Sequence, residues 1–254
     1  MSDFIELRVD TDHPENIPNV LCEAKIDGFK ASWDGSNLIS ERGIVRNDRF
    51  PHLVAELRQI PWKVRGEVAV PFGNVLKINK KENWPKARIY IFDMLEWQGQ
   101  DTRSALPADN RRLIEDAFAT FATFAPQMPS LRMPFKFRDF QTGWAWIIKH
   151  NLEGLVLKEL SGAKTYKVKY MREEKLPVVG FTPGSVKGCF QVERKGVVGG
   201  VSALSVAFVQ QYKDMLSKGL QPYVEIEYMF LTDEGKPFQP RLRRMGTLQE
   251  LATT

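Results

Sequence analysis

A lysine directly before a tight turn is the first candidate for chemistry in this sequence. Residues 23–28 read Glu-Ala-Lys-Ile-Asp-Gly, so Lys25 ends an apolar run and precedes an Asp-Gly pair, which favours a hairpin turn. The neutral amine of such a lysine can attack the α-phosphorus of a nucleotide, expelling pyrophosphate and leaving a phosphoramidate. Neighbouring cations and removal from water favour the neutral amine. Taken alone, the pattern fits an exposed hairpin lysine equally well.

Two further lysines and two glutamates have spacings that suit phosphate chemistry. Lys167 and Lys169 are two residues apart in a predicted strand, so they share one face and can neutralise a triphosphate and its transition state. Glu67 and Glu153 lie in or beside predicted strands, and their hard oxygen ligands suit Mg²⁺ above those phosphates. Each feature alone also fits a solvated strand face or a surface acid.

Six short motifs, in order, resemble those of the covalent nucleotidyltransferase superfamily, which comprises ATP-dependent DNA ligases, RNA ligases and mRNA-capping guanylyltransferases. The motifs read KIDG at 25–28, SERG at 40–43, RGEV at 65–68, YIFD at 90–93, EGLVLK at 153–158 and YKVK at 166–169. Only about 20 residues precede the first motif. The sequence therefore resembles the minimal ATP-dependent DNA ligases of bacteria and their phages, which lack an extra N-terminal DNA-binding domain.

The resemblance implies a role for each candidate residue. Lys25 is the nucleophile that forms lysyl-AMP, assisted by Lys167 and Lys169, while Glu67 and Glu153 hold Mg²⁺ or Mn²⁺. The residues expected to bind ATP are Glu23, Lys25, Lys30, Arg42, Glu67, Phe92, Glu153, Lys167, Lys169 and Arg243.

Three of these assignments concern the ends of the nucleotide. Glu23 lies on the same side of its strand as Lys25, and the resemblance implies that it reads the amino edge of adenine. Phe92 is implied to stack on the purine, although its apolar strand also fits a core aromatic. Arg42 is implied to contact the ribose or the phosphate at a nick.

The sequence departs from the family pattern at two places. Position 30 is Lys where the first motif usually ends in Arg, and lysine keeps the charge but loses the bidentate fork. The last motif is atypical, and we expect one or more of Arg241, Arg243 and Arg244 to orient the pyrophosphate leaving group. Contact with the DNA backbone explains these basic residues equally well.

The predicted elements indicate an α+β fold of two domains. Residues 1–174 form an adenylation (nucleotidyltransferase) domain, with antiparallel sheets and flanking helices such as those expected over residues 50–58, 107–124 and 142–151. Residues 175–254 are mostly strands around one helix at 206–216, which resembles a small OB-fold β-barrel. The charged stretch 172–175 is a candidate hinge between the two domains.

Composition limits the partners and the compartment. The net charge of +5 favours an acidic partner such as nucleic acid, although a mildly basic protein without one is an alternative. Basic loops at residues 77–81 and 187–195 are candidate DNA contacts. Two distant cysteines, an acidic N-terminus and the lack of a long apolar run predict a cytoplasmic protein outside the membrane.

The expected reaction is three phosphoryl transfers at one site. Lys25 attacks ATP and becomes Lys25–AMP, AMP moves to the 5′-phosphate of nicked double-stranded DNA, and the 3′-hydroxyl displaces AMP to seal the strand, in DNA repair or replication. Metal and cations stabilise the charge, so the small number of histidines, three, is no obstacle. We expect a monomer. The alternatives are an RNA ligase or RNA-repair ligase and a non-catalytic OB-containing nucleic-acid-binding protein.

Overall fold

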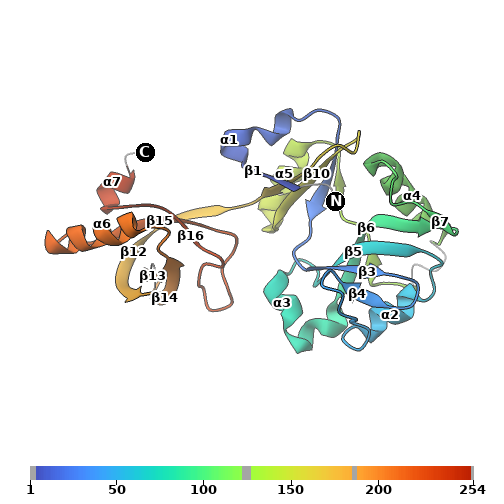
Figure 1. Ribbon diagram of the computed structural model, residues 1–254, viewed down its shortest axis with the longest axis horizontal. Helices are drawn as coiled ribbons and strands as arrows, with labels where there is room; N and C mark the ends of the chain where they lie inside the picture. Colours follow the sequence, from blue (N-terminus) through green and yellow to red (C-terminus); the bar gives the residue numbers. More distant parts are fainter. Residues whose placement is uncertain (1–3, 122–126, 185–187, 253–254) are drawn as a thin grey trace. The chain divides into compact units, whose positions relative to one another are not determined.

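The chain folds into two compact units, Met1–Tyr170 and Met171–Thr254 (Figure 1). The computed structural model describes residues 4–121, 127–184 and 188–252. The domain boundary expected between residues 174 and 175 lies inside strand β12 (Arg172–Pro183). Each unit is described by itself below.

The first sheet of the first unit contains Lys25 at the end of a central strand. Its order is β1-β11-β10-β2-β9, formed by β1 (Phe4–Leu7), β11 (Thr165–Lys169), β10 (Gly154–Glu159), β2 (Val20–Lys25) and β9 (Lys136–Phe137). Strand β1 pairs in parallel with β11, and the other pairs are antiparallel.

Helix α5 (Phe140–His150) covers one face of this sheet. The helix begins where the Asp139 carboxylate accepts a hydrogen bond from the Thr142 amide at 2.7 Å, and it ends at Asn151 in the left-handed conformation. The buried side chains between helix and sheet are Cys22, Ala24, Phe140, Ile147, Leu155, Leu157, Tyr166 and Val168. Because side chains alternate along a strand, the residues between these face away from α5 and form the opposite, charged face.

The second sheet of the first unit has the order β4-β3-β5-β6-β7. Its strands are β4 (Leu38–Ser40), β3 (Phe29–Trp33), β5 (Lys63–Ala69), β6 (Arg88–Trp97) and β7 (Gln100–Asp101), and β8 (Leu131–Arg132) pairs in parallel with β6. Helices α2 (Pro51–Leu57) and α4 (Pro107–Thr120) contribute to a core that includes the fully buried Trp33, Val64, Ile89 and Ile91. The alternate residues Lys30, Arg65 and Glu67 face the other side.

The described residues of the second unit, 171–184 and 188–252, form a five-stranded antiparallel sheet with two helices. Its order is β14 (Val197–Ser202), β13 (Gly188–Arg194), β12, β15 (Tyr223–Tyr228) and β16 (Arg241–Gly246), with α6 (Val206–Ser217) and α7 (Leu248–Ala252). Strand β12 pairs with β15 along residues 172–177 and with β13 along residues 178–183. One long strand therefore joins the two halves of the sheet around the core that contains Phe190 and Ile226.

The expected mixture of helices and several antiparallel sheets is confirmed. The helix predicted over residues 107–124 is described from Pro107 to Thr120, and residues 122–126 lie outside the described residues. The structure adds short elements that the patterns do not predict, among them β1, α1 (Val9–Asp12), α3 (Val75–Asn79) and α7, with the short 3-10 helices η1 (Pro14–Asn16) and η2 (Lys81–Lys86). No helix within the described ranges is long and apolar enough to span a membrane.

The expected hinge is a strand. Residues 172–175 pair in regular register with β15, and the alternation continues into the buried Leu176 and Val178. Within the second unit, Glu174 is held by Arg194 at 2.8 Å and by the Tyr228 hydroxyl at 3.0 Å. The unit boundary falls directly before this stretch, and motion about it stays a prediction.

Candidate active site

The charged face of the first sheet brings together the nucleophile candidate and the paired lysines. Through the strand β10 that they share, Lys25 stands level with Lys169, and Glu23 stands level with Lys167. Two residues along a strand return to the same face, so all four side chains lie on the face opposite α5. Both β2 and β11 pair with β10, and spacing within the sequence does not predict this pairing.

Lys25 forms a close ion pair with Glu153. Lys25 Nζ lies 2.6 Å from Glu153 Oε1, and the two side chains are 18% and 7% exposed. The second oxygen of Glu153 is buried and has no hydrogen-bond partner among the residues that the structure describes. A buried carboxylate oxygen without a donor is costly, so this corner of the site is suited to receive a cation or a donor from outside the chain.

Gly154, the residue after Glu153, allows the close backbone packing that positions Glu153 beside Lys25. Its φ of +151° belongs to glycine, and a Cβ added there would lie 2.0 Å from the carbonyl oxygen of Val168. The backbone of β10 therefore begins in direct contact with β11, and Glu153 stands just before the strand, beside Lys25.

Asp27 and Glu67 are two more acids near Lys25, and both have a raised pKa. Burial, with a contribution from Glu153, raises the pKa of Asp27 to about 6. Burial also raises the pKa of Glu67 to about 7, against the opposing influence of Lys25. The turn that carries Asp27 is pressed against β5, since a Cβ on Gly28 would lie 2.2 Å from the Val68 carbonyl oxygen.

The predicted metal ligands are compatible with a divalent cation. Burial and the nearby Glu153 raise the pKa of Glu67, and Glu153 pairs with Lys25 through only one of its two oxygens. Within the described residues, no group of three or more His, Cys, Asp and Glu forms a metal cage. Mg²⁺ commonly binds one or two carboxylates together with substrate phosphates and water, so two glutamates suffice.

Each of the three lysines expected to bind phosphate contacts another side chain of the first unit. Lys30 Nζ lies 2.8 Å from Glu41 Oε1, and Lys169 Nζ lies 2.5 Å from Glu6 Oε1. Lys167 Nζ lies 3.7 Å from the centre of the Phe4 ring. Burial, followed by the charges of Lys25, Lys30 and Lys169, lowers the pKa of Lys167.

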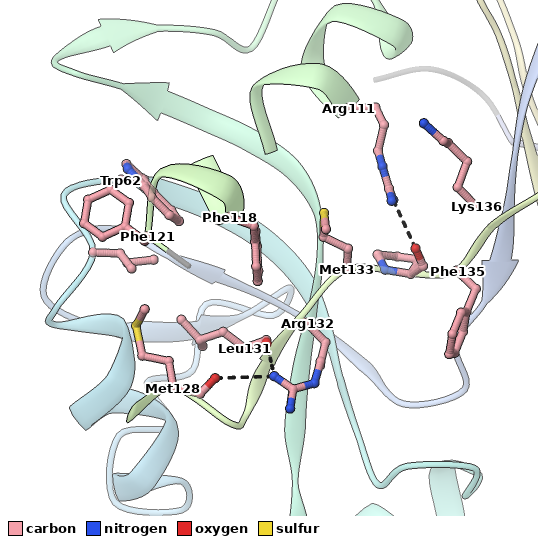
Figure 2. A pocket seen from close by; sticks show the side chains of 12 residues that line it. Trp62, Arg111, Phe118, Phe121, Met128, Leu131, Arg132, Met133, Phe135 and Lys136 are labelled. Carbon is pink, nitrogen blue, oxygen red and sulfur yellow. Dashed lines mark hydrogen bonds between the residues drawn. The ribbon is translucent and has the colours of Figure 1, made fainter. Parts of the chain in front are cut away.

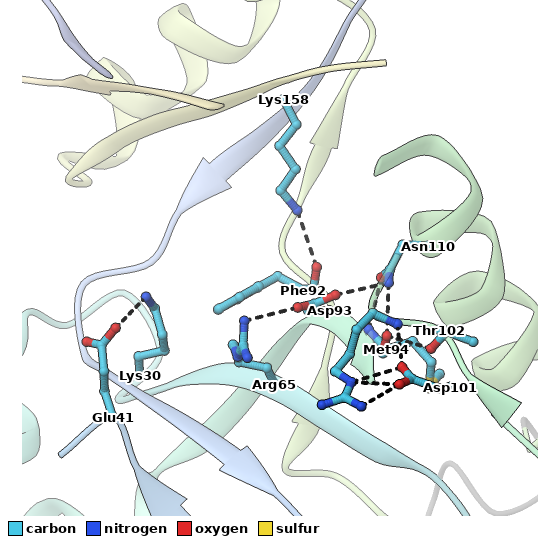
Figure 3. A network of polar contacts seen from close by, with 11 residues as sticks. Lys30, Glu41, Arg65, Phe92, Asp93, Met94, Asp101, Thr102, Asn110 and Lys158 are labelled. Carbon is cyan, nitrogen blue, oxygen red and sulfur yellow. Dashed lines mark hydrogen bonds and ion pairs between the residues drawn. The ribbon is translucent and has the colours of Figure 1, made fainter. Parts of the chain in front are cut away.

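Glu23 is enclosed by cations. Its side chain is 2% exposed, with Oε1 at 2.7 Å from Arg111 and Oε2 at 2.7 Å from Lys158. Lys158 also donates to the Phe92 carbonyl at 3.3 Å and lies 5.7 Å from the centre of the Phe92 ring (Figure 3). Both oxygens of Glu23 are therefore engaged by the chain itself.

Phe92 stands at an irregularity of β6. The register of β5 against β6 shifts from the Arg65–Asp93 pair to the Gly66–Ile91 pair, which leaves Phe92 as the extra residue of a bulge. A bulge turns a side chain out of the regular alternation, and such bulges are frequent beside active sites. The ring is partly buried, close to Lys158.

A separate cavity of about 420 Å³ opens beneath α4 (Figure 2). It is lined mainly by apolar side chains, including Phe118, Met128 and Leu131. None of the predicted site residues lines it, and its link to the charged face is Arg111, which also holds Glu23.

The remaining predicted residues belong to the turn after β4 and to the second unit. Arg42 is exposed in the turn after β4. In the second unit, Arg243 is paired with the buried Glu227, while Arg244 lies 2.6 Å from Glu225. Arg241 is exposed. Lys187, the first residue of one predicted basic loop, lies outside the described residues.

Several residues of the site were not found from the sequence. Arg111 and Phe4 reach it by folding from distant segments, and no local pattern marks them. Lys158 could have been found, because even spacing from Gly154 puts it on the charged face of β10. Asp27 stands inside the first motif, but only the structure reveals its burial and raised pKa.

Searches of the sequence found no matching protein family and no matching curated protein. Solved structures of DNA ligases, by contrast, match nearly the whole chain at low sequence identity. The ligase domain of LigD from M. tuberculosis has a TM-score of 0.53 at 19% identity, covering 96% of this chain and 94% of that one. A mycobacterial DNA ligase D complexed with ATP has a TM-score of 0.51 at 20% identity, covering 90% and 89%. The chain therefore has the fold of the DNA ligases.

Among these structures, the chain also resembles the Lig E DNA ligases, described as binding DNA with a minimal scaffold. The TM-score is 0.68 at 16% identity, and the match covers 97% of this chain and all of that one. The predicted resemblance to a minimal DNA ligase is thus confirmed at the level of the fold.

Proposed function

We propose that this chain is an ATP-dependent DNA ligase that seals nicks through a lysyl-AMP intermediate on Lys25. The observation that carries the proposal is the ion pair of Lys25 with Glu153, on the same face as Lys167 and Lys169, within a DNA ligase fold. The Lig E, LigD and ATP-bound ligase D structures support DNA and ATP as substrates.

In the first step the amine of Lys25 attacks the α-phosphorus of ATP. The N–P bond forms, the bond to pyrophosphate breaks, and the nitrogen loses a proton, for which Glu153 at 2.6 Å is the nearest acceptor. Lys167 and Lys169 neutralise the charge that develops on the phosphate oxygens. AMP then passes to the 5′-phosphate at the nick, and the 3′-hydroxyl displaces it.

Glu67 and Glu153 would hold the metal ion. When bound, Mg²⁺ or Mn²⁺ supplies positive charge to the phosphates and favours the ionised form of both carboxylates. The raised pKa of Glu67 and the unpartnered oxygen of Glu153 support this role.

The base end of the nucleotide would lie near Glu23, Phe92 and Lys158. Phe92 offers an aromatic ring for the purine. Glu23 can accept from the adenine amino group with its remaining lone pairs, while Arg111 and Lys158 hold its carboxylate in place. Lys30 would contact phosphate, and Arg42 would contact ribose or the nick phosphate.

The second unit would act as an OB-fold domain. Its five antiparallel strands with the long, shared strand β12 support a small barrel. Within it we assign Arg243 to the pyrophosphate of ATP. Nicked double-stranded DNA is the substrate that the two units would grip together.

Mass spectrometry of the intact protein tests the assignment. After incubation with ATP and Mg²⁺, the wild-type chain should gain one AMP, located on the peptide that contains Lys25. Lys25→Ala should carry no adduct and should seal no nicked DNA, whereas the control Lys149→Ala, an exposed lysine of α5, should behave as wild type. An AMP adduct that persists on Lys25→Ala would overturn the assignment.

The sealing assay separates DNA from RNA ligation. The wild-type protein should seal a nick in duplex DNA much faster than the same nick in an RNA duplex. Faster sealing of the RNA duplex, with AMP still attached to Lys25, would keep Lys25 as the nucleophile and make RNA the substrate.

A further inference from the structure

A further cation stands beside the site, on the second sheet. Arg65 lies on β5, opposite Ser32 of β3 and Asp93 of β6. Glu67 is two residues further along the same strand, so Arg65 and Glu67 share the face that looks away from the core. Arg65 therefore lies on the same face as Glu67, a predicted metal ligand, and the proposed function gives Arg65 no role.

The guanidinium of Arg65 pairs with the carboxylate of Asp93, which accepts a hydrogen bond from Asn110. Arg65 Nη1 lies 3.4 Å from Asp93 Oδ2, and Asp93 Oδ1 accepts a hydrogen bond from the Asn110 side chain at 2.9 Å (Figure 3). Asn110 is buried, and its own oxygen accepts from the Met94 amide at 2.9 Å. This chain fixes Asp93, which in turn fixes where Arg65 points.

Arg65 has hydrogen-bonding capacity left over. The Arg65 side chain is 42% exposed, and its described hydrogen bond to Asp93 uses one of the five N–H donors of a guanidinium. An arginine fixed at one edge and open at the other suits bidentate binding of a phosphate.

The charges that act at this rim comprise three cations, Arg65, Lys30 and Lys167, against two carboxylates, Glu41 and Asp93. Lys30, Lys167 and Arg65 all act on the exposed carboxylate of Glu41, and the hydrogen bond from Lys30 is the main cause that lowers its pKa. Three cations against two carboxylates leave an excess of positive charge at this rim of the site. A phosphate arriving there meets several cations at once.

The position of Arg65 favours contact with a phosphate of a DNA strand over contact with a phosphate of ATP. The described charged neighbours of Arg65 are Asp93 and Glu41, whereas Glu67 on the same strand interacts with Lys25 and Glu153. Arg65 is also more exposed than Lys25, at 42% against 18%. The nucleophile and its carboxylates thus occupy the inner part of the site, and Arg65 stands at its rim.

We propose that Arg65 is a further DNA-binding residue, whose guanidinium, positioned by Asp93, contacts a backbone phosphate of the nicked strand. The inference rests on the proposed ligase function and adds to it a residue outside the assigned set. A contact of this kind serves nick binding and sealing but not the formation of Lys25–AMP.

The test compares Arg65→Ala and Arg65→Lys with Arg112→Ala, which removes an exposed arginine of α4 that is paired with Asp109 at 3.5 Å. Three quantities are measured: the rate of Lys25–AMP formation, the affinity for a nicked duplex at several KCl concentrations, and single-turnover sealing by pre-adenylylated protein without ATP. For Arg65→Ala we expect nick binding about tenfold weaker, with a log–log salt slope lower by about one. Adenylylation should stay within about twofold, and sealing should fall with binding.

Arg65→Lys keeps the fold and the charge, so it should retain the salt slope and lose a part of the affinity. The proposal is overturned if Arg65→Ala binds the nick as Arg112→Ala does, or if adenylylation falls as much as sealing, which would assign Arg65 to ATP. Failure of the proposed function looks different, because the wild-type protein itself would then form no Lys25–AMP.

Discussion

Two acidic side chains beside Lys25 are held where ionisation is unfavourable. Glu67 and Asp27 have pKa values raised to about 7 and about 6, in both cases mainly by burial. An acid with a raised pKa in the folded chain binds its proton more tightly there than in the unfolded chain. Its ionisation therefore destabilises the fold, increasingly as the pH rises from the unfolded pKa to the folded pKa. Binding sites often retain such groups because a ligand supplies the missing charge.

This gives a prediction for Glu67→Gln without nucleotide or divalent metal. Between about pH 5 and about pH 8 the wild-type chain should lose stability as Glu67 ionises, by on the order of 3 kcal/mol from this group. Glu67→Gln should lack that part of the loss, as measured by urea unfolding at both pH values.

Glu250 provides a control of opposite sign. Hydrogen bonds from Thr247 lower its pKa, so its contribution to stability is present at high pH and fades as the pH falls. Glu250→Gln should therefore cost about the same stability at about pH 8 and about pH 5, and the cost should shrink only as the pH falls below about 4.5. A Glu67→Gln variant with the pH dependence of the wild type would show that the burial of Glu67 does not govern its ionisation.

Single residues were predictable where the chain is locally periodic. Lys167 and Lys169 share a face because they are two apart on a strand, and Lys25 stands out because it precedes an Asp-Gly turn. The partners of these residues were not predictable. Arg111 reaches Glu23 across 88 positions of sequence, which only the packing of α4 beside the first sheet achieves.

At the scale of elements, strand β1 has a direct bearing on phosphate binding. It adds in parallel to β11, the strand of the paired lysines. From this edge Glu6 pairs with Lys169, and the Phe4 ring lies against Lys167. One short strand thus contacts both cations that the proposed mechanism directs at the triphosphate.

Glu6 is expected to compete with phosphate for Lys169. The pair is partly exposed, at 54% for Glu6 and 24% for Lys169, and such pairs contribute about 0.2–1 kcal/mol. Glu6→Gln should therefore lower the KM for ATP in adenylylation by about two- to fivefold. The control Glu15→Gln removes an exposed acid from the same segment and should leave KM unchanged. A higher KM for Glu6→Gln would mean that the carboxylate helps to position Lys169 instead.

The long periodic elements were predictable and the short ones were not. Helix α6 follows its apolar pattern closely, but β1 has four residues and no alternation of buried and exposed positions. Residues 172–175 suggested a hinge because only their charged composition was considered. Their alternation with Leu176 and Val178, one face buried and one charged, indicates a strand, and β12 has this pattern.

At the scale of the whole molecule, a net charge of +5 spread over two units leaves DNA affinity to the placement of cations. Backbone contacts made by few cations give binding that weakens as salt is added. The proposed reaction also requires the second unit to serve a site whose nucleophile belongs to the first. Arg243 is the residue through which this cooperation can be measured.

Arg243 should act in the first step only, because pyrophosphate is present only there. For Arg243→Lys we expect Lys25–AMP formation to slow by about 100-fold, while sealing of a nick that already carries AMP on its 5′-phosphate stays within about threefold. Lysine keeps a positive charge beside the buried Glu227, whereas alanine would remove the charge that Arg243 supplies there and risk destabilising the fold.

Arg241→Lys and Arg244→Lys, measured in parallel, identify the residue that serves pyrophosphate. Arg241 is exposed and Arg244 is held by Glu225, so both changes test the same strand with different surroundings. If either slows adenylylation while Arg243→Lys does not, the assignment moves to that residue. If all three slow the sealing of adenylylated DNA and spare adenylylation, β16 binds the DNA backbone and the leaving group is stabilised elsewhere.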